Sequence, residues 1–167
     1  MTGPRKALVS LGSNLGDRRA NLRRGLALLE RQSVVVLLAV SSFHRSTAAE
    51  KCVGGGEFIN AVTLLATPLG IGDLGRLTSA VENRLGRRED RRRRDHARRL
   101  DLDLLLMDGE VGEEDGFIVP HPRLLRRAFI LRPAAGIAPG MIVPTTGLTL
   151  AEHLGRLRDS RRGGLSD

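Results

Sequence analysis

Two aspartates stand two residues apart in a leucine-rich segment, which reads Leu-Asp-Leu-Asp-Leu-Leu-Leu at residues 100–106. In a β-strand, residues i and i+2 project from the same face, so Asp101 and Asp103 are predicted to project together. The same alternation places on the opposite face Leu100, Leu102, Leu104 and Leu106. Neighbouring carboxylates repel each other unless a cation lies between them, and Mg²⁺ prefers carboxylate oxygens combined with substrate phosphates. The pair alone fits either a metal site or an exposed strand with solvated acids.

An arginine-rich stretch at residues 87–99 immediately precedes the aspartates, and its only hydrophobic residue is Ala97. This composition predicts an exposed loop. Guanidinium groups bind phosphate oxygens in bidentate geometry, and phosphoryl transfer from a nucleotide requires metal-binding carboxylates flanked by positive charge. A solvated surface loop or a nucleic-acid-binding patch is the alternative interpretation. We expect only two or three of these arginines to touch phosphate.

Two further groups of residues could contact a ligand. Phe58 and Asn60 share one face of a predicted strand, which pairs an aromatic ring with an amide that both donates and accepts hydrogen bonds. His121 lies between two prolines and is followed by Arg126 and Arg127, so it could contact phosphates. For each of these residues, core packing or a structural turn is the alternative explanation.

Short apolar runs predict four strands, at residues 7–11, 34–40, 58–65 and 100–107. The second run is rich in β-branched residues and predicts a well-covered strand that extends toward His44. Residues 12–16 lack the Lys-Ser/Thr ending of a phosphate-binding loop, so they are interpreted as a tight turn. A second loop is expected at 113–116.

Helical spacing of leucines predicts four helices, which begin near Asp17, Thr67, Arg123 and Leu150. Asp17 is a predicted N-cap, and Thr149 with Glu152 forms a capping-box pattern. Strands and helices are interleaved without a repeat or a linker, so we expect one α+β domain over residues 1–167, with a frayed tail at 158–167.

Composition limits the class of protein. The 167 residues include 27 Lys and Arg against 19 Asp and Glu, which gives a formal net charge of +8. Four Phe without Trp or Tyr are few rings for a protein that stacks on single-stranded nucleic acid. The single cysteine, Cys52, excludes an intrachain disulfide, and the apolar run at 34–40 is shorter than a membrane span of about 20 residues. We therefore expect a cytoplasmic protein, and a monomer because no feature demands a dimer.

Six segments together match one protein family in their order and spacing. They are Leu11–Asp17, Ser41–Arg45, Phe58–Ala61, Glu82–Arg87, Arg98–Leu105 and Val119–Leu131. On these segments the sequence resembles the 6-hydroxymethyl-7,8-dihydropterin pyrophosphokinases over nearly the whole chain, from Ala7 to about Leu157. The resemblance implies a ferredoxin-like α+β core, in which helices cover a largely antiparallel sheet.

The resemblance also implies roles for individual residues. Asp101 and Asp103 fall on the aspartates that bind two Mg²⁺ ions, and with Arg87 and Arg98 they form the implied catalytic set. The implied pterin-binding residues are Ser46, Ala49, Phe58, Asn60 and Phe129. The implied nucleotide-binding residues are Glu82, Arg87, Arg98, His121 and Arg127.

The implied reaction is transfer of pyrophosphate from ATP to the hydroxymethyl group of 6-hydroxymethyl-7,8-dihydropterin, with release of AMP, in folate biosynthesis. The attack is in line on the β-phosphorus and is assisted by the two Mg²⁺ ions. At residues 95–98 this chain has Asp-His-Ala-Arg, where many members carry Trp-Gly-Pro-Arg. The second loop arginine that contacts phosphate is therefore one of three candidates, Arg88, Arg91 or Arg92. The alternative function is an Arg-rich nucleic-acid-binding α+β module, which would need exposed aromatic residues on its strands.

Overall fold

The computed structural model describes residues 3–47, 56–86 and 97–163. Within these ranges the strands and helices follow one another in the order β1 (Arg5–Ser13), α1 (Arg18–Glu30), β2 (Val36–Val40), β3 (His44–Ser46), β4 (Phe58–Thr67), α3 (Ile71–Arg84), β5 (Asp101–Met107), β6 (Gly112–Glu114), β7 (Phe117–Val119), α5 (Ala128–Ile137), β8 (Ile142–Val143), β9 (Leu148–Thr149) and α6 (Leu150–Gly163).

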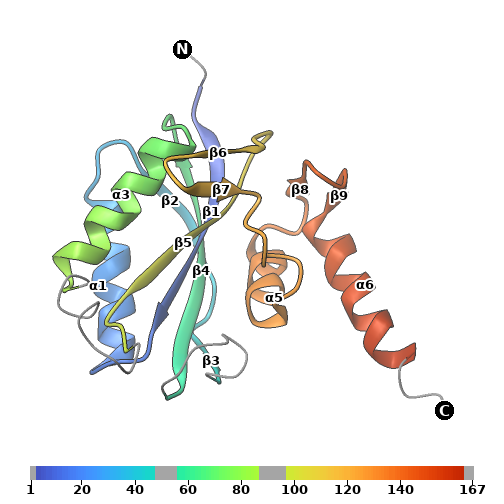
Figure 1. The fold of residues 1–167 in the computed structure, drawn as a ribbon, viewed down its shortest axis with the longest axis horizontal. Helices are drawn as coiled ribbons and strands as arrows, with labels where there is room; N and C mark the ends of the chain where they lie inside the picture. The colour runs from blue at the N-terminus through green and yellow to red at the C-terminus, as the bar shows by residue number, and fades with distance from the viewer. Residues whose placement is uncertain (1–2, 48–55, 87–96, 164–167) are drawn as a thin grey trace.

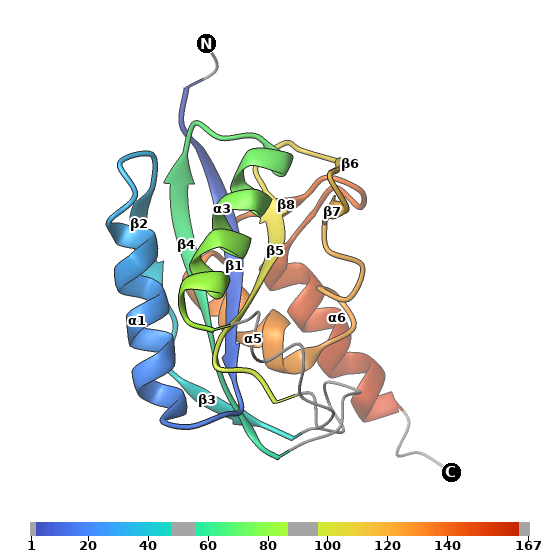
Figure 2. The ribbon, with the colours of Figure 1, turned by 60° about the vertical axis from the view of Figure 1, so that its left-hand side comes forward.

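An antiparallel sheet with the strand order β2-β4-β1-β5 forms the centre of the fold, and β3 pairs with the first residues of β4. The chain order β1-α1-β2-β4-α3-β5 with this strand order is the ferredoxin-like arrangement, which confirms the predicted fold class. Helices α1 and α3 cover one face of the sheet, and α5 lies against the other face (Figure 1). Figure 2 shows the same layers from the side of α1 and α3, with α6 behind, where it packs on α5.

Both faces of the central strands are buried. Ala7, Val9 and Leu11 of β1 belong to the hydrophobic cluster between the sheet and helices α1 and α3. Leu8 points the other way and belongs to the cluster that includes Leu131 of α5. Apolar residues of β1 thus lie on both sides of the sheet. A polar side chain on the side that faces α5 therefore has apolar neighbours.

A β-bulge corrects the predicted alternation along β5. Leu8 pairs with Leu106, whereas the next residue of β1, Val9, pairs with Leu104, so Leu105 is an extra residue on β5. Leu106 therefore lies in the cluster on the α5 side, and not with Leu104 on the α1 and α3 side as predicted. Both aspartates precede the bulge, so their shared face is unaffected.

The prediction that residues 34–40 form a well-covered strand is wrong. β2 lies at an edge of the sheet, where Val36 is 59% exposed and Leu38 is 48% exposed. The strand ends at Val40, and His44 begins a separate short strand. A continuous apolar run does not distinguish a covered strand from an edge strand, because the elements that would cover it are distant in the sequence.

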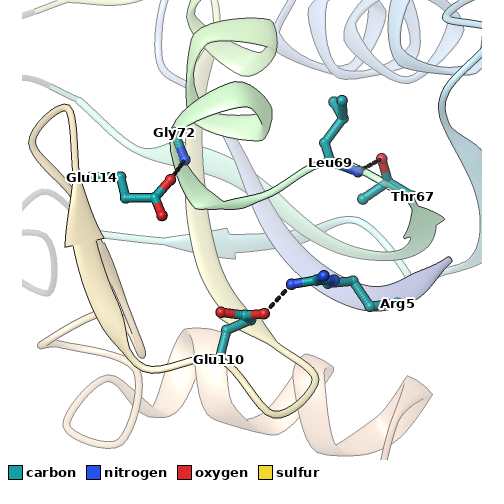
Figure 3. A network of polar contacts seen from close by, with 6 residues as sticks. All are labelled: Arg5, Thr67, Leu69, Gly72, Glu110 and Glu114. Atoms are coloured by element: carbon teal, nitrogen blue, oxygen red, sulfur yellow. Dashed lines mark hydrogen bonds and ion pairs between the residues drawn. The ribbon is translucent and has the colours of Figure 1, made fainter. Parts of the chain in front are cut away.

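Two helices begin later than their sequence patterns predict. β4 continues through Thr67, whose Oγ1 accepts a hydrogen bond from the backbone N–H of Leu69 at 3.2 Å (Figure 3). α3 therefore begins at Ile71, and α5 begins at Ala128 after a series of turns that starts near Arg123. Among the described residues, no helix combines the length and the apolar character needed to cross a lipid bilayer.

The predicted helix caps are confirmed. Asp17 Oδ1 accepts from the backbone N–H of Ala20 at 3.0 Å. Thr149 and Glu152 cap α6 reciprocally, at 2.8 Å from the Thr149 N–H to Glu152 Oε2 and 3.2 Å from the Glu152 N–H to Thr149 Oγ1. α6 then runs to Gly163, through most of the segment expected to be frayed, because its Arg and Leu residues favour a helix.

Residues 113–116, expected to form a loop, belong to a β-hairpin of β6 and β7. Asp115 and Gly116 have φ values of 53° and 82°, as a two-residue type I′ turn requires. Glu114 Oε2 accepts from the N–H of Gly72 at 2.8 Å in the first turn of α3, and Arg5 forms an ion pair with Glu110 (Figure 3). The hairpin is thereby held against α3 beside β5.

Candidate active site

A cavity of about 230 Å³ opens on the α5 side of the sheet, where β4, β1 and β5 meet the chain leading into α5. Its lining includes eight of the predicted site residues, which are Phe58, Asn60, Arg98, Asp101, Asp103, His121, Arg127 and Phe129. These residues come from segments far apart in the sequence. The structure therefore brings together the two predicted metal-binding residues, three of the predicted pterin-binding residues and three of the predicted nucleotide-binding residues.

The strand register lines up the polar residues across the sheet. Gly12 of β1 pairs with Asn60 of β4 on one side and with Asp101 of β5 on the other, so the three residues share one face. Ser10 pairs with Asp103 in the next row. Two strand spacings separate the backbones of Asn60 and Asp101 by about 10 Å, and Gly12 places no side chain between them. A ligand that lies over Gly12 can therefore extend from the Asn60 amide to the carboxylates of Asp101 and Asp103.

Asp101 and Asp103 form the carboxylate pair of this cavity. Asp101 Oδ1 accepts from Arg98 Nη1 at 2.7 Å, and the Asp101 side chain is 19% exposed. In the part of the chain that the structure describes, no three His, Cys, Asp or Glu side chains are grouped to hold a metal ion. Two carboxylates offer the hard oxygens that Mg²⁺ prefers but leave most of its octahedral positions to other ligands. The pair fits Mg²⁺ shared with a phosphate-bearing substrate.

Arg98 is positioned through its backbone by Asn14. The Asn14 N–H donates to the carbonyl of Arg98 at 3.1 Å, and Asn14 Oδ1 accepts from the N–H of Arg98 at 2.6 Å. The sequence predicts a tight turn over residues 12–16, but Gly12 and Ser13 continue β1. Asn14, which follows them, fixes the chain that carries Arg98 next to Asp101.

Glu82 holds the backbone between the two aspartates. Its side chain is buried, at 1% exposure, and Oε1 accepts from the N–H of Leu102 at 2.7 Å. β5 has only β1 as a strand neighbour in the described sheet, so a side chain from α3 satisfies this N–H in place of another strand. Glu82 therefore supports the carboxylate pair from the side opposite β1.

His121 is held by two backbone hydrogen bonds. Its N–H donates to the carbonyl of Leu105 at 2.7 Å, and its Nδ1 accepts from the N–H of Arg123 at 3.1 Å. The neutral ring consequently carries its proton on Nε2. Burial lowers the pKa of His121, Arg127 and Arg123 lower it further, and Asp101 partly opposes them. At neutral pH the side chain is an uncharged hydrogen-bond donor.

The predicted pterin-binding residues have defined supports. Asn60 and Ser46 are both buried, and Asn60 Nδ2 donates to Ser46 Oγ at 2.7 Å. Ser46 therefore orients the amide from behind and is not itself among the residues that line the cavity. On the other side, the guanidinium of Arg127 lies 5.7 Å from the centroid of the Phe129 ring. Ala49, Arg87 and the loop arginines 88, 91 and 92 lie outside the described residues.

A second cavity, of about 380 Å³, adjoins the first and shares Asp103, His121 and Arg123 with it. Glu82, a predicted nucleotide-binding residue, lines this second cavity. The hairpin supplies Phe117 and Ile118, and β5 supplies Leu104. The two cavities therefore meet beside Asp103.

The comparison with protein families decides between the interpretations. The model of the 7,8-dihydro-6-hydroxymethylpterin-pyrophosphokinase (HPPK) family matches residues 8–139 of this chain. The chain belongs to this family. The prediction of an ATP-dependent pyrophosphokinase of folate biosynthesis is confirmed, and the nucleic-acid-binding alternative finds no support.

Two bacterial HPPK relatives illustrate the similarity. The chain is 40% identical over 131 residues to the 2-amino-4-hydroxy-6-hydroxymethyldihydropteridine pyrophosphokinase of Bacillus subtilis (strain 168), covering 78% of this chain and 77% of that one. It is 34% identical over 139 residues to the enzyme of the same name from Pseudomonas aeruginosa, covering 83% of this chain and 84% of the relative.

Solved HPPK-DHPS structures share the fold. One in complex with substrates has a TM-score of 0.71 at 10% identity, and the match covers 97% of this chain and 45% of the longer one. The wild-type Plasmodium falciparum HPPK-DHPS with pterin and p-hydroxybenzoate has a TM-score of 0.70 at 10% identity, covering 99% and 45% of the two chains. At this identity the likeness concerns the fold alone.

Several cavity residues were not predicted as site residues of this HPPK. Ser10 and Arg123 line the first cavity, and Phe117 and Ile118 line the second. Ser10 had a sequence signal, because it is a single polar residue inside a buried apolar strand. The hairpin residues had none, because their place beside β5 depends on contacts with α3.

Replacement of Glu82 tests its role as a support. Glu82→Leu removes the acceptor for the buried Leu102 N–H, so we expect the free energy of unfolding to fall by about 1–3 kcal/mol. We also expect kcat to fall, because the aspartates on either side lose a fixed backbone. Glu82→Gln keeps an acceptor oxygen and should recover most of both losses. Urea denaturation measures the free energy of unfolding, and an AMP-release assay measures kcat. If Glu82→Leu and Glu82→Gln had the same stability and the same kcat, Glu82 would not act as the acceptor that supports β5.

The pKa of His121 offers a second test. We expect a value below the ordinary 6.5, and an increase in the Arg127→Met variant, because one of the charges that lowers it is lost. As pH falls through 6.5 the unfolded chain takes up this proton before the folded chain does, so the folded state loses stability. An NMR titration assigned with His121→Asn measures the pKa, and Arg132→Met, on the exposed side of α5, is the control. If Arg127→Met left the pKa of His121 unchanged, the charge of Arg127 would not be one of the causes of the lowered pKa.

Proposed function

We propose that this enzyme transfers pyrophosphate from ATP to 6-hydroxymethyl-7,8-dihydropterin at the cavity lined by Asn60, Phe129 and the carboxylate pair. One observation supports this placement above all. A single row of the sheet carries Asn60, the open position at Gly12, and Asp101. A flat heterocycle that binds at one end of this row has a substituent within reach of phosphates bound at the other end.

The pterin is proposed to bind at the Asn60 end. An amide both donates and accepts, so it can pair with the mixed donors and acceptors on the edge of a pterin ring. Phe58 and Phe129 line the same cavity and offer aromatic surface to a flat ring. Ser46 keeps the amide oriented. Ala49 is proposed to contact the pterin as well.

ATP is proposed to span the junction of the two cavities. Its base and ribose would occupy the second cavity, which Phe117 and Ile118 line, and its phosphates would lie at the junction near His121. Arg98 and Arg127, together with Arg87, are proposed to bind phosphate oxygens there. Nε2 of His121 is a neutral donor for the same oxygens.

Asp101 and Asp103 are the residues proposed to hold two Mg²⁺ ions together with the ATP phosphates. When bound, magnesium supplies neutralisation of phosphate charge and polarisation of the phosphoryl group. The chain itself positions the reactants. The rings and Asn60 aim the hydroxymethyl oxygen at the β-phosphorus, and the arginines offset the charge on AMP. The new bond joins this oxygen to the β-phosphorus as the bond from the β-phosphorus to the α,β-bridging oxygen breaks; AMP leaves and the hydroxyl proton passes to solvent.

The nucleotide product tests the proposal. Purified protein with Mg²⁺, ATP and 6-hydroxymethyl-7,8-dihydropterin should release AMP and form the pterin pyrophosphate, with no ADP. Omission of either the pterin or Mg²⁺ should abolish AMP release. Release of ADP, or of neither nucleotide when both substrates bind, would overturn the proposed reaction.

A further inference from the structure

A proline interrupts the hydrogen-bond ladder of α5 at the residue that carries the proposed pterin-binding ring. Pro133 lies four residues after Phe129 within the helix. In an α-helix the N–H of residue i+4 donates to the carbonyl of residue i, but proline has no N–H and its ring crowds that carbonyl. Pro133 therefore cannot supply the donor that the carbonyl of Phe129 would otherwise meet.

His44 of β3 reaches this carbonyl. Its Nε2 lies 2.7 Å from the carbonyl oxygen of Phe129, across 85 residues of sequence. A carbonyl oxygen only accepts, so Nε2 must carry the proton and donate it. The other ring nitrogen, Nδ1, lies 3.4 Å from the carbonyl of Ser42, which is long for a hydrogen bond. The contact to Phe129 is the stronger of the two.

The place of His44 in the sheet links this contact to the site. His44 pairs with Asn60 across β3 and β4, and Ser46 follows two residues later on the same face. Ser46 binds the side chain of Asn60, and His44 binds the backbone of Phe129. One short strand thus contacts both the amide and the ring-bearing residue that are proposed to hold the pterin.

We propose that His44 is a positioning residue for pterin binding, which holds the backbone of Phe129 so that its ring faces the pterin. This inference rests on the proposed function, because it gives Phe129 a pterin to contact. A carbonyl that is anchored to β3 fixes the first turn of α5 relative to Asn60. The binding surface then needs less ordering when the pterin arrives, and preorganisation of this kind raises affinity.

Three variants separate the hydrogen bond from the shape of the side chain. His44→Phe keeps a flat ring but has no donor. His44→Gln places an amide N–H close to the position of Nε2, and His44→Asn places one close to Nδ1, too short to reach Phe129. A cavity of about 700 Å³ borders His44 and Pro133, so the new side chains have room without displacing the buried core.

Fluorescence titration with 6-hydroxymethylpterin, in the presence of Mg²⁺ and α,β-methylene-ATP, measures the effect on pterin binding. We expect His44→Phe and His44→Asn to raise the Kd about three- to ten-fold, as for the loss of one neutral hydrogen bond, and His44→Gln to stay within about two-fold of the wild type. The Kd of the nucleotide should stay unchanged in all three variants. ¹⁵N NMR of the wild-type imidazole should show the proton on Nε2.

Three results would overturn the inference. The first is wild-type pterin affinity in His44→Phe. The second is equal weakening of pterin and nucleotide binding with no recovery in His44→Gln, which indicates a general structural role. The third is an imidazole protonated on Nδ1 alone. If the wild type itself binds no pterin, the proposed function fails, and the NMR result still decides whether the contact from His44 to Phe129 exists.

Discussion

Asp103→Asn is expected to lower kcat by about 10²–10³-fold, the largest effect of any substitution considered for this enzyme. Asparagine keeps the size of the side chain but removes the negative charge that would bind Mg²⁺ beside Asp101. The folded state should not lose stability, because the change relieves repulsion between two carboxylates on one face of β5. AMP release under saturating substrates and thermal unfolding measure the two quantities. Isothermal titration with Mg²⁺ in the presence of ATP should show the weaker metal binding directly.

Asp108→Asn is the matched control, because Asp108 is an exposed acid just beyond the end of the same strand. It should leave kcat and the Mg²⁺ dependence unchanged. Asp101→Asn should also reduce turnover, and it breaks the ion pair with Arg98 as well. A kcat near the wild-type value in Asp103→Asn would show that the two acids are merely solvated residues of an edge strand.

Phe129→Ala is expected to raise the Kd of the pterin about 10–100-fold while the Kd of ATP changes less than two-fold. A stacked aromatic ring contributes about 1–3 kcal/mol, and the ring lines the first cavity but not the second. The substitution removes the ring and keeps the carbonyl that His44 binds. Separate titrations with 6-hydroxymethylpterin and with α,β-methylene-ATP distinguish the two affinities.

Phe43→Ala provides the control for loss of a ring. Phe43 packs against the α1 side of the core, where the guanidinium groups of Arg19 and Arg23 lie 6.0 and 5.9 Å from its centroid. This variant should lose some stability without changing the ratio of the two affinities. Equal weakening of pterin and ATP binding in Phe129→Ala would indicate that the ring serves core packing.

Local patterns predicted the elements that carry the chemistry. The alternation in β5 placed Asp101 and Asp103 on one face, because a two-residue period is a property of any strand. The caps at Asp17 and Thr149 were predictable for the same reason, since a capping side chain binds a backbone group only three residues away. The family resemblance then supplied which residues share a site.

Other features were not predictable, because they depend on partners distant in the sequence. The bulge at Leu105 arises from pairing with β1, and the exposure of β2 arises from its place at the edge of the sheet. The β6 and β7 hairpin is held by the contact of Glu114 with Gly72 and was expected to be a loop. In each case the local residues fit more than one structure, and the tertiary contacts selected one.

The sequence by itself determined that two carboxylates share a face and that arginines stand near them, because spacing and charge are local properties. Only the tertiary structure decided what those groups face and what supports them. Strand register placed Gly12 between Asn60 and Asp101, and long-range hydrogen bonds joined Asn14 to Arg98 and His44 to Phe129. Register and packing are set by the whole sheet and its covering helices, so no local pattern contains them.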